Sequence, residues 1–108
     1  MIRGDLITAA LAGDYGKPRP CLVVQSDHLA KLDSVLLCPL TSLVDTAGPA
    51  RVIVMPDKLN GLAVRSVVMV DKVTALSRSR CREKIGSVNE LVLEQVNGVL
   101  LFVLGLLD

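Results

Sequence analysis

Short runs of apolar residues, separated by turn-forming residues, make up most of this chain. Four such runs, each rich in aliphatic side chains, occupy residues 5–10, 21–26, 35–40 and 51–55. Runs of this length and composition are typical of buried β-strands. The Gly, Pro and polar residues between them predict loops, the longer ones over residues 11–20 and 41–49.

Residues 63–72 alternate in a way that predicts the longest strand of the sheet. One face carries the odd-numbered side chains, from Arg65 through Met69 to Asp71, and the other face carries the even-numbered ones. An Asn-Gly pair at 60–61, just before this run, is a strong turn signal. Because the odd face begins and ends with opposite charges, we expect it to lie at the rim of a cleft.

Near the C-terminus the spacing of the apolar residues becomes that of a helix. Ser87 followed by Glu90 matches a capping box, and apolar residues then recur on one face of the predicted helix. They are Val92, Val96, Val99, Leu100 and Val103. From Val99 onward the segment is apolar on almost every side, so the sheet of one subunit cannot cover it. This excess predicts a homodimer.

Taken together, these elements define the fold class. Ser26 or Asp27 is placed to cap a short helical turn over residues 28–32. Five or six short strands and one C-terminal helix predict an α+β, mainly β fold, in the form of a small closed or half-closed barrel. With 108 residues, the chain is expected to form a single domain over 1–108.

Composition limits the kind of site that this fold can carry. The chain has one Tyr, one Phe and no Trp, so a nucleic-acid site here would lack an aromatic stacking platform. The formal net charge of +1 neither predicts nor excludes nucleic-acid binding. Five basic residues between positions 71 and 84 fit two interpretations, a phosphate site or a solvated loop.

The cysteines and the apolar segments indicate the cellular compartment. Three cysteines without a CxxC spacing argue against a disulfide framework. The N-terminus has no signal-peptide core. The longest apolar stretch, residues 99–107, is too short to span a bilayer. The sequence therefore predicts a soluble cytoplasmic protein.

Several common kinds of active site are missing from the sequence. His28 is the single histidine, which excludes a site with two His ligands, and the predicted polar turn is a poor place for a general base. There is no glycine-rich phosphate-binding motif. We therefore expect neither a metal nor a cofactor.

Four polar segments remain to carry chemistry. Gly-Lys-Pro-Arg-Pro at 16–20 leads into one apolar run, Pro-Leu-Thr-Ser at 39–42 ends the next, Asp71 lies near the end of the long predicted strand, and Arg-Gly-Asp at 3–5 opens the chain. This arrangement resembles the MazF/PemK family of toxin endoribonucleases from type II toxin–antitoxin systems. The likeness extends over residues 3–107, and its specific part is the Arg-Pro step followed by Pro-Leu-Thr-Ser.

The resemblance implies both a fold and an activity. The implied fold is an SH3-like barrel with a C-terminal helix, assembled as a homodimer. The implied activity is metal-independent cleavage of single-stranded RNA, including mRNA, which arrests translation and growth. Attack by the 2′-OH would give 2′,3′-cyclic phosphate and 5′-OH ends. The expected partner is a cognate antitoxin protein, with DNA reached only through that antitoxin.

The family pattern also assigns residues to roles. The expected catalytic residues are Arg19, Thr41 and Asp71, and the expected RNA contacts are Lys17, Ser42, Arg65 and Met69. A guanidinium matches phosphate oxygens and stays protonated, so we expect Arg19 to stabilise the transition state. Thr41 is expected to donate a hydrogen bond to a non-bridging oxygen. Asp71 is expected either to take the 2′-OH proton or to orient Arg19 or Arg65.

The chain departs from the PemK branch in two respects. Met69 stands where that branch has a second catalytic Arg, two residues before the Asp, and the His of the first loop is absent. This favours an Arg19–Thr41 site over an Arg–Asp pair. Each of these residues also has a simpler, structural interpretation. Arg19 could be an ordinary arginine of a surface loop, Thr41 could serve to form a turn, and Asp71 could form a structural ion pair at the end of a strand.

Two other functions fit the same fold. A gyrase poison of the CcdB type shares the barrel but requires a C-terminal Trp-Gly-Ile, whereas this chain ends Leu-Leu-Asp and has no Trp. A family member without catalysis, acting only in binding, is the second alternative, and Met69 keeps it open. We expect the loops 11–18 and 41–49 to determine which RNA sequence is recognised.

Overall fold

The computed structural model describes residues 1–11, 17–43 and 48–107 of the chain. The strands are β1 (Asp5–Ala10), β2 (Pro18–Val23), β3 (Ser34–Thr41), β4 (Arg51–Val54), β5 (Ser66–Met69), β6 (Thr74–Ser77) and β7 (Cys81–Ser87). They are followed by the helix α1 (Glu90–Val103). Short 3₁₀ helices include η1 (Asp27–Leu29), η3 (Val70–Lys72) and η4 (Arg78–Arg80). Parts of the two predicted recognition loops, 12–16 and 44–47, lie outside the described residues.

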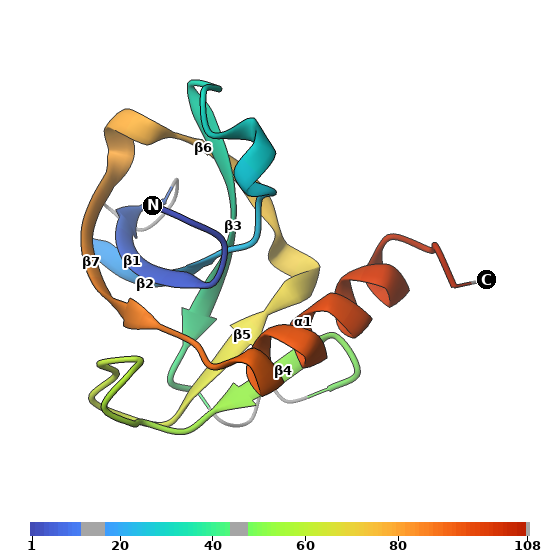
Figure 1. Cartoon of the computed structure of the whole chain (residues 1–108). Coiled ribbons are helices and arrows are strands. Elements are labelled where there is room, and N and C mark those ends of the chain that lie inside the picture. The colour runs from blue at the N-terminus through green and yellow to red at the C-terminus, as the bar shows by residue number, and fades with distance from the viewer. Residues whose placement is uncertain (12–16, 44–47, 108) are drawn as a thin grey trace.

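The strands form one strongly curved antiparallel sheet (Figure 1). Its order is β4-β5-β3-β2-β1-β7, and β6 also pairs with β3. Strand β3 joins the two parts of the sheet, because it pairs with β2 and β6 along most of its length and with β5 near its end. Among the described residues no pairing closes the sheet into a complete barrel. The predicted α+β, mainly β class with a C-terminal helix is confirmed.

Two apolar clusters stabilise this arrangement. Leu6, Leu22 and Leu40 belong to the cluster that α1 helps to cover. Ile7 and Leu37 belong to a second cluster, on the other side of the sheet. The central strands are therefore buried on both faces, which explains why their sequences are apolar without alternation.

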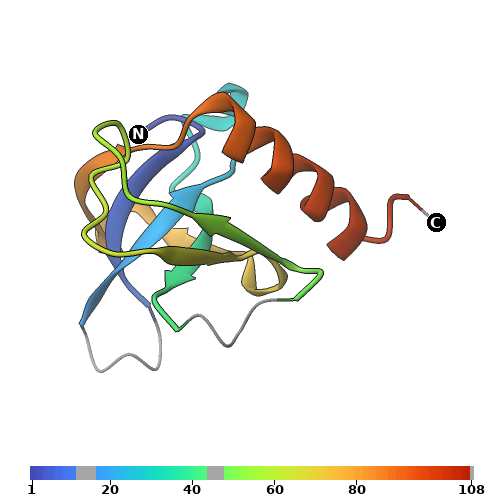
Figure 2. The same cartoon turned by 90° about the horizontal axis from the view of Figure 1, so that it is seen from below.

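Helix α1 lies across one face of the sheet beside β4 (Figure 2). Val96 is fully buried, and the other residues of the predicted apolar face are half-buried against the same cluster. The chain after α1 extends away from the sheet (Figure 2). No helix in the described part of the chain is long and apolar enough to cross a membrane.

The prediction of one long strand over residues 63–72 is wrong. Strand β5 has four residues, Ser66–Met69, and the chain then turns into η3. The Val70 amide donates a hydrogen bond to the Ala50 carbonyl at 3.1 Å, which places Val70 in the core at the bend. The apolar alternation therefore continues past the end of the strand, and the sequence pattern did not reveal the bend.

The region of residues 74–87 contains two strands that the sequence pattern did not predict. In β6 only Leu76 is buried, and β7 is an edge strand whose Arg82, Glu83 and Lys84 are exposed. Charged side chains are common on edge strands because they discourage pairing with other molecules. The basic cluster thus lies on η3, η4 and an edge strand, with most of its side chains exposed to solvent.

The predicted helix caps have different outcomes. The capping box of Ser87 and Glu90 is wrong, because Asn89 is the N-cap and its side chain accepts a hydrogen bond from the Val92 amide at 2.9 Å. Ser87 ends β7 instead. At the short turn, Ser26, one of the two predicted caps, accepts a hydrogen bond from the His28 amide at 3.2 Å, and the turn covers Asp27–Leu29 and not residues 28–32.

Candidate active site

A cavity of about 230 Å³ lies just beyond the end of the β2–β3 ladder. The paired residues of this ladder end at Cys21 and Pro39. Pro20 and Pro39 have no N–H group, so neither can donate a further ladder hydrogen bond. The residues past this point line the cavity: Arg19 and Pro20 from β2, and Leu40, Thr41 and Ser42 at the end of β3.

The segment before β5 forms the opposite wall, with Leu62, Ala63, Val64 and Ser66. The preceding turn holds this wall in place through Asn60, which is almost completely buried. Its side-chain oxygen accepts from the amides of Asp57 and Leu62, at 3.1 and 3.0 Å, and its side-chain nitrogen donates to the Met55 carbonyl at 2.8 Å.

The turn predicted at positions 60–61 is confirmed by the backbone of Gly61. This residue has a φ of +67°, a conformation that side-chain-bearing residues rarely adopt. A Cβ there would also lie 2.1 Å from the Ile85 carbonyl oxygen. Both observations require glycine at the turn that carries the cavity wall.

The Thr41 hydroxyl is oriented by its own backbone. Its Oγ1 accepts a hydrogen bond from the Leu43 amide at 3.2 Å. Because this contact uses the oxygen as an acceptor, the hydroxyl hydrogen can point to an oxygen atom bound in the cavity. Ser66, on the facing wall, donates its own hydroxyl to the Val64 carbonyl at 3.0 Å. Thr41 is therefore the better placed of the two as a donor to a ligand.

The structure brings some of the predicted site residues together. Arg19, Thr41 and Ser42 line the same cavity, although Arg19 and Thr41 are on different strands. Lys17 is exposed just before β2 and does not line this cavity. Arg65 also lies outside the cavity lining and is exposed just before β5.

Sequence reasoning missed most of the apolar wall. The residues not predicted are Pro20, Leu40, Leu62, Ala63, Val64 and Ser66. Ser66 carried one available signal, since it is a polar residue among the valines 64, 68 and 70 on the even face of the run. The other residues have the composition of ordinary core or turn residues, so only their position in the fold reveals them.

Asp71 pairs with an arginine that the sequence did not indicate. Arg51, the first residue of β4, contacts it through two bonds, Nε to Oδ1 at 2.9 Å and Nη2 to Oδ2 at 3.4 Å. In the β4–β5 register Arg51 lies directly opposite Met69. Neither Asp71 nor Met69 lines the Arg19–Thr41 cavity.

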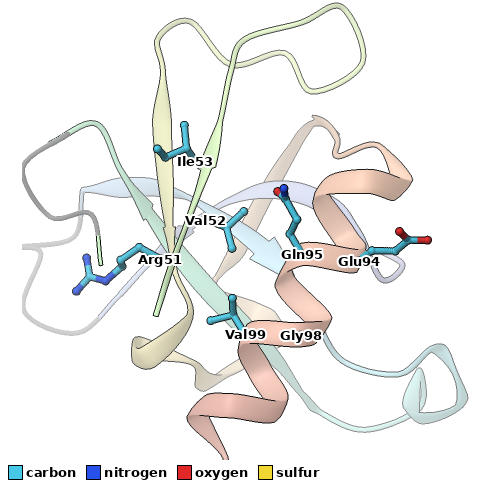
Figure 3. Close-up of a pocket in the computed structure, with 7 residues that line it drawn as sticks. All are labelled: Arg51, Val52, Ile53, Glu94, Gln95, Gly98 and Val99. Carbon is cyan, nitrogen blue, oxygen red and sulfur yellow. The ribbon is translucent and has the colours of Figure 1, made fainter. Parts of the chain in front are cut away.

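A second, larger hollow of about 500 Å³ lies between β4 and α1 (Figure 3). Val52 and Val99 point toward each other across it, and Gly98 leaves it open because it has no side chain. The side chain of Arg51 extends away from α1 in this view. The hollow is therefore a seam between helix and sheet, and Arg51 contributes to its lining while the end of its side chain is directed away from α1 in Figure 3.

Within residues 1–11, 17–43 and 48–107, Arg19 is the one titratable side chain that lines the cavity. Burial raises the pKa of the Cys38 thiol to about 12, which keeps it protonated and unreactive inside the core. In the described residues no group of three or more His, Cys, Asp or Glu side chains is placed to hold a metal ion. The chemically useful groups of the cavity are thus the Arg19 guanidinium and the hydroxyls of Thr41 and Ser42.

A curled antiparallel sheet with one C-terminal helix, and a cavity lined by an arginine and a threonine where two strands separate, define a small mainly β protein. A family model described as "PemK-like, MazF-like toxin of type II toxin-antitoxin system" matches residues 2–104. The chain belongs to this family, as its sequence motifs predict.

Individual relatives agree with this membership. The chain is 37% identical over 107 residues to a protein described as "Probable endoribonuclease MazF" from Mycolicibacterium smegmatis, with 98% of each chain covered. The structure of the present chain is similar to that of MazF from Deinococcus radiodurans in crystal form I. The TM-score is 0.79, the sequence identity is 28%, and 97% of this chain and 96% of that chain are covered.

A mycobacterial structure described as an endoribonuclease in complex with its cognate antitoxin has a TM-score of 0.83 and 21% identity, and 98% of this chain and 96% of that chain are covered. At this level of identity the likeness shows the fold alone.

Proposed function

We propose that this endoribonuclease toxin cuts single-stranded RNA, including mRNA, in the cavity lined by Arg19 and Thr41, and that it needs no metal ion. Family membership gives the class of activity. The observation that supports the site is that Arg19, Thr41 and Ser42, which come from two strands, line one cavity where the β2–β3 ladder ends. A guanidinium and two hydroxyls are suitable ligands for a phosphodiester.

The chemistry requires no co-reactant. The ribose 2′-oxygen attacks the adjacent phosphorus, and the bond from phosphorus to the 5′-oxygen breaks. The 2′-OH loses a proton and the departing 5′-oxygen gains one, so the products are a 2′,3′-cyclic phosphate and a 5′-OH end. Negative charge increases on the non-bridging oxygens in the transition state. Arg19 stabilises that charge, and Thr41 donates a hydrogen bond to one of these oxygens.

The proposed partners follow from the cavity and from the C-terminus. A relative has been solved with its cognate antitoxin, and we expect a protein of that class to inhibit this chain in the cytoplasm. An acidic segment with apolar anchors would fit the surroundings of Arg19, because Val64 is exposed in the cavity lining and Leu43 is exposed next to Ser42 in the chain. We also propose a homodimer that covers the apolar C-terminus, and contact with DNA only through the antitoxin.

The test is cleavage of a mixed pool of single-stranded RNA by purified protein, with and without excess EDTA. We expect equal rates in both, and 3′ ends that resist a polymerase or ligase until the cyclic phosphate is removed. Loss of cutting on chelation, restored by a divalent ion, would reject the metal-free mechanism. Absence of cutting in every condition would favour a family member that acts only in binding.

A further inference from the structure

We propose that Arg51 and Asp71 form a second polar site on the RNA-binding face, where Arg51 contacts a phosphate beside the one that is cut and Asp71 is the positioning residue that holds its guanidinium. This inference rests on the proposed function. It gives Asp71 a role through Arg51, and not as a base that removes the 2′-OH proton.

The strand register places this pair on the same face of the sheet as Thr41. Thr41 is directly opposite Val67 in the β3–β5 ladder, and Val67 is opposite Ile53 in the β4–β5 ladder. Paired residues project to the same side of a sheet, as do residues two apart in one strand. Arg51, two residues from Ile53, therefore shares this side with Thr41.

The opposite side of these strands is closed by the core. Leu40, Val68 and Val52 form the adjacent row of the register and belong to the cluster beneath α1. Figure 3 shows the same division, because Val52 points to the helix and Arg51 points away from it. The guanidinium is thus directed to the surface that carries Thr41.

The distance between the two sites suits an extended nucleic acid. Arg51 and Thr41 are separated by two strand positions and by two residues along the strand direction. With strands about 4.8 Å apart and about 3.3 Å of rise per residue, their Cα atoms lie about 12 Å apart. A short stretch of single-stranded RNA that binds at Arg19 and Thr41 can continue over this distance to Arg51.

The pairing with Asp71 leaves part of the guanidinium without a partner. The Asp71 carboxylate accepts one contact from Nε and one from Nη2 of Arg51. A guanidinium has five N–H donors in all. Nη1 is buried and has no hydrogen-bond partner in the described part of the chain. A buried donor without a partner is unfavourable, and a small shift of the side chain on RNA binding would let a phosphate oxygen accept a hydrogen bond from it.

The ion pair is not needed to hold the two segments together. The Val70 amide already binds the Ala50 carbonyl at 3.1 Å, and all four residues of β5 pair with β4. The Arg51 side chain is nevertheless only 15% exposed, and Asp71 is 39% exposed. A buried arginine fixed by a carboxylate has its planar donors in one orientation, which is the property required to position a phosphate.

The experiment compares the single variants Arg51→Met and Asp71→Asn with two double variants, Arg51→Met/Asp71→Asn and Arg51→Met/Met69→Arg. Lys31→Met is an exposed control on another part of the chain. Two readouts are needed: kcat and KM for cleavage of a single-site RNA, and affinity for 2′-O-methyl RNA, which cannot be cut. We expect Arg51→Met to raise KM and weaken affinity by about tenfold to a hundredfold, the usual effect of losing one charge-assisted hydrogen bond.

The other variants test the link between the two residues. Asp71→Asn should have a smaller effect in the same direction, and no further effect when Arg51 is already Met. Moving the arginine to position 69, directly across the ladder, should restore part of the affinity. If Arg51→Met is unfolded by circular dichroism, Arg51→Lys replaces it, with an expected loss of affinity because lysine cannot form the two-bond contact.

Three results would overturn the proposal: unchanged KM and RNA affinity in folded Arg51→Met, a full effect of Asp71→Asn in the Arg51→Met background, or a loss in kcat alone. Failure of the proposed function has a different signature. In that case Arg19→Ala would cut RNA like the wild type, whereas the affinity of Arg51→Met for uncleavable RNA would still decide the role of Arg51.

Discussion

Asn60 lies so close to Gly86 that a Cβ atom at position 86 would be 2.4 Å from the Asn60 carbonyl carbon and oxygen. The turn that contains Asn60 can therefore rest on β7 only because residue 86 has no side chain. The same turn leads into Leu62 and Val64, which form one wall of the Arg19 cavity. A glycine distant from the cavity in the sequence thus determines where this wall lies.

Gly86→Ala should destabilise the protein and also lower RNA cleavage. Inserting a methyl group into packed backbone usually costs about 1–3 kcal/mol, and the turn must shift to make room for it. The matched control is Gly98→Ala in α1, where a Cβ would meet nothing within 4 Å. That change should stabilise the protein by about 0.5–1 kcal/mol. Urea unfolding measures both, and equal effects would contradict the role of the Asn60–Gly86 contact.

Arg19→Ala should lower kcat/KM by about 10²–10³, as expected when one preorganised donor to the transition state is removed. The fold should survive, because the Arg19 side chain is exposed. Thr41→Val, which keeps the side-chain shape but removes the hydroxyl, should have a smaller effect, and Thr41→Ser should be nearly normal. Rates are measured on one RNA substrate, with Lys31→Ala as control. Near-normal cleavage by Arg19→Ala would place the active site elsewhere.

Asp5 should make folding stability depend on pH in the acid range. Burial of its carboxylate opposes ionisation, but hydrogen bonds from the Ile2 amide, Lys84 and Ser87 outweigh this and lower the pKa. A lowered pKa in the folded state gives stability above the unfolded pKa of about 3.9, which is lost as the pH falls through the folded value. Asp5→Asn should therefore destabilise the protein by about 1.5–3 kcal/mol at pH 7.

The difference in free energy of unfolding between wild type and Asp5→Asn should begin to shrink near pH 4, where the carboxylate of the unfolded chain is protonated, and should disappear below the lowered pKa of the folded protein. Urea titrations at neutral and acid pH give the two free energies of unfolding. Asp33→Asn, an exposed carboxylate, serves as control and should stay within about 0.5 kcal/mol at both. A difference that persists at low pH would mean that Asp5 contributes by packing and not by its charge.

The apolar C-terminus should form a dimer contact. Phe102, Leu104 and Leu106 are each more than half exposed in the single chain, and exposed patches of this kind mark association surfaces. Light scattering at micromolar concentration should give twice the monomer mass, and Phe102→Glu/Leu106→Glu should give the monomer. Leu32→Glu, at an exposed leucine elsewhere, should leave the dimer intact. A monomeric wild type would contradict the dimer.

The sequence by itself determined the parts of this protein that depend on local pattern. The apolar run at residues 5–10 coincides with β1, and the helical spacing from Val92 to Val103 describes the face of α1 that packs on the core. Family membership was also visible, because the Arg-Pro and Pro-Leu-Thr-Ser segments are contiguous in the chain. Local rules suffice for such features, since propensity and periodicity act over neighbouring residues.

Only the tertiary structure decided the features that depend on distant segments. The bend at Val70 is set by its hydrogen bond to Ala50, and β7 exists because it pairs with β1. The Arg51–Asp71 ion pair depends on the register that sets Arg51 opposite Met69, which no local pattern encodes. The Arg19–Thr41 cavity depends on two prolines that end a ladder between separate strands, so its wall could be identified only once those strands were packed together.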